Sequence, residues 1–192
     1  MTEHPSAARR PLFLILIAAG FFMLAAACLP LLLRSLAGAP GGSGTTFPPL
    51  LINQAAPSLA LTDLQGHAVS LEDYHGKLVL VNNWATWCPP CQAEMPDLQA
   101  YYQAHAAQGF VIVAIESGEP AGTVSDFVRQ HGLTFPVWPD PQESATAAFQ
   151  NWDLPSSYVV DQAGRLRMYW TGEINPATLE KYITPLLDGL PK

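Results

Sequence analysis

Two cysteines, Cys88 and Cys91, stand at the start of a predicted helix, directly after a short apolar segment. The positive end of a helix dipole favours thiolates, and a thiolate is both the nucleophile of disulfide exchange and a metal ligand. The remaining cysteine, Cys28, lies far upstream in an apolar segment, so the downstream domain can form no other internal disulfide. The pair is therefore redox-active, metal-binding or a static disulfide.

Redox exchange fits this pair better than the other two uses. A structural zinc site normally needs four ligands, and the sequence has no second CxxC motif and no close histidine pair. A static disulfide over so short a loop would constrain the unfolded chain little, so it would stabilise the fold weakly. Zinc binding and a static disulfide remain as alternatives, and we expect neither a metal nor another cofactor.

The position of the pair assigns different roles to the two sulfurs. With Cys88 at the N-cap, Cys91 falls at the third helical position and is covered by the first turn. We expect Cys88 to be the exposed nucleophile and Cys91 to resolve the mixed disulfide. Pro89 and Pro90 remove two backbone donors, so only the helix dipole and the Cys91 amide can stabilise the Cys88 thiolate. We expect a moderately lowered pKa for Cys88 and a reducing pair.

Glu94 follows Cys91 by three positions on the same predicted helix. At that spacing its carboxylate can accept the Cys91 proton directly or through water. The alternative is that Glu94 lies on a solvated face and only complements the positive helix end.

Residues 82–96, NNWATWCPPCQAEMP, resemble the TlpA/ResA-type thioredoxin-like family of membrane-tethered thiol-disulfide oxidoreductases. The similarity extends over about residues 56 to 188 and includes LPSSYVVDQAG at 154–164, which resembles the family's cis-proline loop and hairpin. The resemblance implies that Pro155 is cis opposite the disulfide and that Leu154 offers its backbone to an extended partner peptide. It also places Glu94 near the cysteines. Trp87 is a candidate for the substrate groove, whereas Trp84 fits the core at least as well.

Asn82 and Asn83 end the apolar segment before the motif. An amide takes up no proton at relevant pH, which leaves Glu94 as the better proton acceptor. Asn83 departs from the aromatic residue that the family usually has there. A second buried amide must find hydrogen bonds or lower stability.

The elements that position the cysteines form an α/β pattern. Apolar strands at 78–81 and 110–115 flank a helix at 92–108, which makes one βαβ unit. The other expected elements are a hairpin of 59–62 and 67–71, helices at 123–131 and 144–151, a hairpin of 157–160 and 165–170, and a helix capped by Asn175 that runs toward Leu187 with a break at Pro185. We predict a thioredoxin-like fold, with a mixed central sheet flanked by helices and an N-terminal β-hairpin extension.

The N-terminal part carries the membrane prediction. Residues 12–33 contain no charge and would span about 33 Å as a helix, enough for a hydrocarbon core of about 30 Å. Arg9 and Arg10 place residues 1–11 in the cytoplasm by the positive-inside rule, so 12–33 is a single transmembrane signal anchor. Residues 34–55, rich in Gly and Pro, are expected to be a flexible linker before a domain at 56–192. A cleavable signal peptide and a lipoprotein anchored through Cys28 are the alternatives.

Charge and topology define the expected partners. Beyond Arg34 the chain has six Lys or Arg and fifteen Asp or Glu, a net charge of −9 with histidines neutral, which excludes a nucleic-acid-binding surface. We expect a single-pass cell-membrane protein whose soluble domain, on the extracytoplasmic side, reduces protein disulfides. The resemblance implies substrates in cytochrome c maturation (apocytochrome c) or copper-site assembly, and a transmembrane thiol carrier as electron donor. A disulfide-forming or isomerising oxidant and a copper-binding assembly factor are the alternatives; a peroxidase would need a different cysteine arrangement.

Overall fold

The computed structural model describes residues 48–189. The expected cytoplasmic segment 1–11, the membrane anchor 12–33 and the first part of the linker lie outside these residues. Within 48–189, none of the helices combines the length and the hydrophobicity needed to cross a bilayer.

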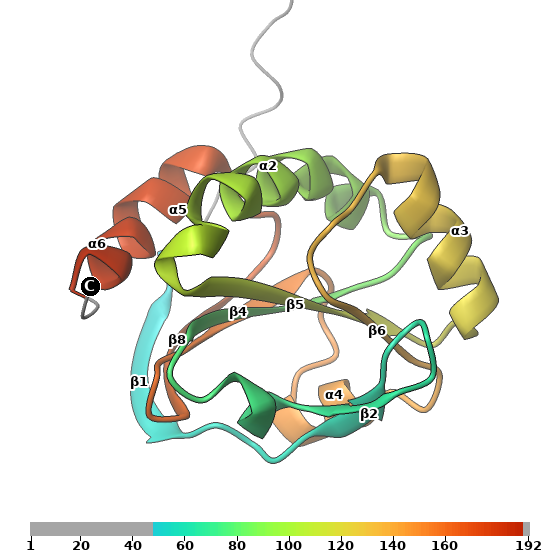
Figure 1. Cartoon of the computed structure of the whole chain (residues 1–192), viewed down its shortest axis with the longest axis horizontal. Coiled ribbons are helices and arrows are strands. Elements are labelled where there is room, and N and C mark those ends of the chain that lie inside the picture. The colour runs from blue at the N-terminus through green and yellow to red at the C-terminus, as the bar shows by residue number, and fades with distance from the viewer. Residues whose placement is uncertain (1–47, 190–192) are drawn as a thin grey trace, which may run out of the picture. The chain divides into compact units, whose positions relative to one another are not determined.

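A six-stranded mixed sheet forms the centre of the domain (Figure 1), in the order β1-β8-β7-β4-β5-β6. Its strands are β1 (Leu50–Ala55), β4 (Leu78–Trp84), β5 (Phe110–Ser117), β6 (Val137–Asp140), β7 (Ser156–Val160) and β8 (Arg165–Thr171). β4, β5 and β6 are parallel, whereas β7 is antiparallel to both β4 and β8. Every residue of β4 and β5 is buried, as their continuous apolar sequences predict.

Two hydrophobic clusters cover the two faces of this sheet. Because side chains alternate along a strand, Leu78 and Leu80 of β4 point to one face, and Val79 and Val81 point to the other. The first face is covered by four helices: α2 (Pro89–His105), α3 (Ala121–His131), α5 (Pro176–Tyr182) and α6 (Thr184–Asp188). The second face is covered by α4 (Ser144–Phe149) and by the hairpin of β2 (Ala60–Thr62) and β3 (Ala68–Ser70). This hairpin continues into the 3-10 helix η2 (Leu71–Tyr74). Another 3-10 turn, η3 (Ala106–Gln108), follows α2.

The structure confirms most of the expected elements and corrects three. Residues 50–55 were assigned to the flexible linker but form β1, an edge strand whose backbone pairs with β8. Most β1 side chains are exposed, so the sequence carries no alternating pattern there. β6 was not expected, because a four-residue segment with an internal proline has little strand character. The C-terminal helix is divided at Ile183 into α5 and α6, with Pro185 in the first turn of α6.

One end of the sheet collects the loops around the cysteines, and we call it the cysteine end. The parallel strands β4 and β5 both finish there, with Trp84 beside Glu116. β7 begins there, with Ser156 opposite Asn83. Loop 85–88, loop 118–120 and loop 150–155 are therefore neighbours, although they are far apart in sequence.

Candidate active site

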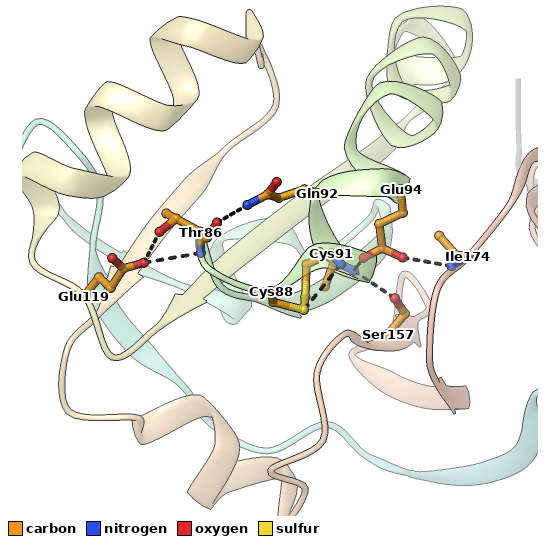
Figure 2. Close-up of a disulfide and its surroundings, with 9 residues drawn as sticks. Thr86, Cys88, Cys91, Gln92, Glu94, Glu119, Ser157 and Ile174 are labelled. Carbon is orange, nitrogen blue, oxygen red and sulfur yellow. Dashed lines mark hydrogen bonds between the residues drawn. A yellow bond between two sulfur atoms is a disulfide. The ribbon is translucent and has the colours of Figure 1, made fainter. Parts of the chain in front are cut away.

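Cys88 occupies the N-cap of α2, with an extended backbone, and is joined to Cys91 by a disulfide (Figure 2). The helix begins here because Pro89 and Pro90 have the fixed φ that suits its first turn and lack N–H groups that would have no intrahelical partner. Cys88 is 4% exposed and Cys91 is fully buried. Cys88, the nucleophile that we expected to be exposed, is thus nearly covered in the oxidised state. The small accessible surface that the pair retains still belongs to Cys88 and not to Cys91.

The Cys91 amide is the backbone donor to Cys88 that the two prolines leave in place. Its N–H lies 3.3 Å from the Cys88 Sγ. This contact and the helix dipole would stabilise a thiolate at Cys88 after reduction. The arrangement matches the donor set expected from the sequence.

Glu94 is fully buried beneath the first turn of α2, so the solvated-face alternative is wrong. Its Oε2 accepts a 2.8 Å hydrogen bond from the Ile174 backbone N–H (Figure 2). Its Oε1 accepts one of 2.8 Å from Asn82 Nδ2. Burial raises the pKa of Glu94 to about 8, although these two hydrogen bonds oppose the shift. Glu94 thus exchanges a proton near neutral pH, one helical turn from Cys91.

The two asparagines at the end of β4 differ in their contacts. Asn82 Nδ2 also reaches Ser157 Oγ at 3.1 Å, so Asn82 links Glu94 to β7. Within the described residues, the Asn82 Oδ1 atom and both polar side-chain atoms of Asn83 are buried without a hydrogen-bond partner. Of the two outcomes expected for Asn83, the structure favours the second, in which its unpaired buried amide lowers the stability of the fold.

The peptide bond between Leu154 and Pro155 is cis, as the resemblance implied. Pro155 directly precedes β7 and is buried at the cysteine end. The backbone N–H and C=O of Leu154 form no backbone hydrogen bond with the rest of the described chain. Leu154 is also half-buried rather than fully covered, so these two groups are candidates for hydrogen bonds with a partner backbone.

The two tryptophans of the motif have opposite environments. Trp87 is 65% exposed beside Cys88, which suits a contact with a partner. Trp84 is fully buried and packs on Phe127 of α3 with ring centroids 4.9 Å apart, so it belongs to the core.

Sequence reasoning missed a carboxyl pair that holds the loop before Cys88. The Glu119 carboxylate accepts hydrogen bonds from the backbone N–H and the hydroxyl of Thr86 (Figure 2), and Glu116 Oε2 accepts from the Glu119 N–H at 3.1 Å. Glu116 is buried at the end of β5, and burial together with the neighbouring Glu119 carboxylate raises its pKa to about 8. The only signal in the sequence was an acidic residue ending an otherwise apolar strand.

Within 48–189, no group of three or more His, Cys, Asp or Glu side chains is placed to hold a metal ion.

Comparisons with known proteins identify the family of the chain. Residues 52–169 match the model of the AhpC/TSA family. Over 132 residues, covering 69% of this chain and 76% of the relative, the chain is 37% identical to thiol-disulfide oxidoreductase ResA of Geobacillus kaustophilus, and 36% identical to ResA of Bacillus anthracis over the same shares.

Solved structures of similar proteins extend the comparison. A thiol:disulfide interchange protein of the thioredoxin family from Chlorobium tepidum is 27% identical, with a TM-score of 0.64 over 71% of this chain and 97% of that one. A DsbF homologue from Corynebacterium diphtheriae is 25% identical, with a TM-score of 0.64 over 77% and 96%. The Cys88–Cys91 disulfide at a helix N-terminus, the cis-proline at the same end of the sheet and these similarities together establish that the chain belongs to the AhpC/TSA thioredoxin-like family and is a thiol-disulfide oxidoreductase of the ResA type.

Proposed function

We propose that this protein reduces disulfides of other proteins outside the cytoplasm, with Cys88 as the nucleophile. The observation that carries the proposal is the placement of the pair: Cys88, at the N-cap of α2, has the small accessible surface of the pair, and Cys91, one turn into the helix, is fully buried. Disulfide exchange needs an attacking thiolate that a partner can reach and a resolving thiol that it cannot.

The reaction would proceed in two exchanges. The Cys88 thiolate attacks one sulfur of the partner disulfide, that S–S bond breaks, and the second partner sulfur leaves as a thiolate. Cys91 then loses its proton and attacks the Cys88 sulfur, which releases the first partner sulfur and leaves the Cys88–Cys91 disulfide. The partner gains two electrons, and the reduced pair loses them.

Glu94 would accept the Cys91 proton in the second step. A buried thiol holds its proton more tightly than an exposed one, and a carboxylate with a pKa near 8 is a stronger base than an ordinary glutamate. About a tenth of such a group is ionised at pH 7, so resolution should become faster as the pH rises toward 8.

Location and partners extend the proposal beyond the described residues. The uncharged segment 12–33 would anchor the chain in the cell membrane, with the acidic domain on the extracytoplasmic side. Apocytochrome c or copper-site proteins would be the substrates, and a transmembrane thiol carrier would return electrons to the Cys88–Cys91 disulfide.

The test is a trapping experiment with the full chain. Cys91→Ser should accumulate mixed disulfides on Cys88 that thiol reagents release, because the second exchange cannot occur. Cys88→Ser is the matched control and should capture no partner. Equal trapping by both variants would refute the assignment of roles, and a pair that stays oxidised in strongly reducing thiol buffer would refute the reductase.

A further inference from the structure

Exposed aromatic side chains flank the active site on two loops. Trp87 precedes Cys88, and Trp152 lies two residues before Leu154 in the loop that leads into β7; each is 65% exposed. The second loop is held in place because the Asn151 N–H donates to the Thr146 carbonyl at 3.0 Å and Asn151 Nδ2 lies 3.4 Å from Thr171 Oγ1, at the end of β8. Both tryptophans thus belong to defined loops at the cysteine end, and sequence reasoning did not single out Trp152.

Acidic residues surround these tryptophans. The loops at the cysteine end follow β4, β5, β6 and β8 and precede β7. Their accessible charged residues are all acidic: Glu119, Glu143, Asp153 and Glu173. A surface hollow of about 330 Å³ beside Thr86 is lined in part by Asp126, but this carboxylate pairs with Arg129 and is not counted with the four loop acids.

The basic residues lie away from this rim. Residues 48–189 contain five Lys or Arg against fifteen Asp or Glu. Lys77 precedes β4, Arg165 and Arg167 lie in the first half of β8, and Arg129 and Lys181 occupy the last turns of α3 and α5. Arg129 pairs with Asp126 at 2.8 Å, and Arg167 pairs with Asp161 at 2.9 Å. Within the described residues, no Lys or Arg forms an ion pair with the four loop acids, so a partner meets their uncompensated negative charge.

We propose that this rim, formed by Trp87, Trp152 and the four loop acids, selects extended polypeptide segments in which Lys or Arg flanks the cystine. The inference rests on the proposed function and names its substrate class. The open backbone groups of Leu154 pair with the extended segment, the tryptophans cover its apolar side chains, and the acids attract its cations. Segments with acidic residues beside the cystine are repelled.

The experiment measures the oxidation of the reduced full chain, purified in nonionic detergent, by three disulfides. Two are cystine peptides that are identical except that Lys residues flank the cystine in one and Glu residues in the other. The third is bis(2-hydroxyethyl) disulfide, which is neutral and too small to reach the rim. Stopped-flow tryptophan fluorescence gives second-order rate constants at low and high salt.

The Lys peptide should react at least about tenfold faster than the Glu peptide near 10 mM ionic strength. The ratio should fall to within about twofold near 1 M, where the Debye length is about 3 Å. The double variant Asp153→Asn with Glu173→Gln should lower the ratio severalfold at low salt. Asp188→Asn, an exposed acid in the last turn of α6, is the matched control and should leave it unchanged.

Trp152→Ala tests the aromatic contribution separately. It should slow both peptides about equally without changing their ratio, because the ring contacts apolar groups that the two peptides share. Equal peptide rates at low salt, while the small disulfide is still reduced, would overturn the inference and leave the reductase intact. Failure to reduce any of the three disulfides would overturn the proposed function together with it.

Discussion

Replacing Glu94 with Gln removes a buried titration that should control how stability depends on pH. Burial raises the pKa of Glu94 from 4.5 to about 8, so between these values the folded chain holds a proton that the unfolded chain has lost. The native state then binds more protons, and the free energy of unfolding falls as the pH rises. Stability from this group is complete below pH 4.5 and is lost progressively up to pH 8.

The size of the effect follows from the shift. At about 1.4 kcal/mol per pKa unit, the loss between pH 5 and pH 9 is about 4 kcal/mol, which is an upper value. The Gln side chain resembles the protonated form. Its amide can donate to Asn82 Oδ1 if the Asn82 amide turns, and that oxygen has no hydrogen-bond partner within the described residues. We therefore expect a cost of only about 1 kcal/mol at pH 5.

Urea unfolding of the oxidised chain from pH 5 to pH 9 measures this difference, because neither cysteine titrates while the disulfide is intact. The wild type should lose about 4 kcal/mol more than Glu94→Gln over this range. Glu180→Gln, at an exposed position of α5, should retain the wild-type pH dependence. Parallel curves for wild type and Glu94→Gln would show that Glu94 ionises in the folded state as an exposed glutamate does.

Three further results are expected. Asn83→Leu should raise the free energy of unfolding by about 1 to 2 kcal/mol in urea denaturation, because it removes two buried polar atoms that have no partner in the described structure. Glu116→Gln should flatten the fall of stability above neutral pH, since the raised pKa of Glu116 acts with the same sign as that of Glu94; thermal unfolding at pH 6 and pH 9 measures it. In stopped-flow assays, release of a preformed Cys88 mixed disulfide should accelerate from pH 6 to pH 8 in the wild type, and Glu94→Gln should slow release and weaken its pH dependence.

The first two of these expectations have matched control variants, and the third has a refuting outcome. Asn53→Leu, on the exposed edge strand β1, should not stabilise the chain, because Asn53 accepts a hydrogen bond from Arg165. Glu143→Gln, an exposed acid in the loop before α4, should keep the wild-type change between pH 6 and pH 9. If Glu94→Gln released the mixed disulfide at the wild-type rate, Glu94 would not be the proton acceptor of Cys91.

The sequence by itself determined the features that depend on local spacing. The run of apolar residues at 78–81, the two cysteines and the prolines between them specify a buried strand that leads into a helix N-terminus, because a helix start needs only neighbouring residues. The βαβ unit and the hairpins followed from the same kind of local pattern, and the resemblance of 154–164 anticipated the cis-proline.

Tertiary structure decided the environment of the carboxyl groups and the pairing of the edge strand. Glu94 is buried and bonded to the amide of Ile174, eighty positions along the chain, so its pKa depends on elements that its own helix does not specify. Glu119 reaches Thr86 only because β4 and β5 end side by side. β1 forms through backbone hydrogen bonds to β8 with its side chains largely exposed, so no hydrophobic period marks it in the sequence.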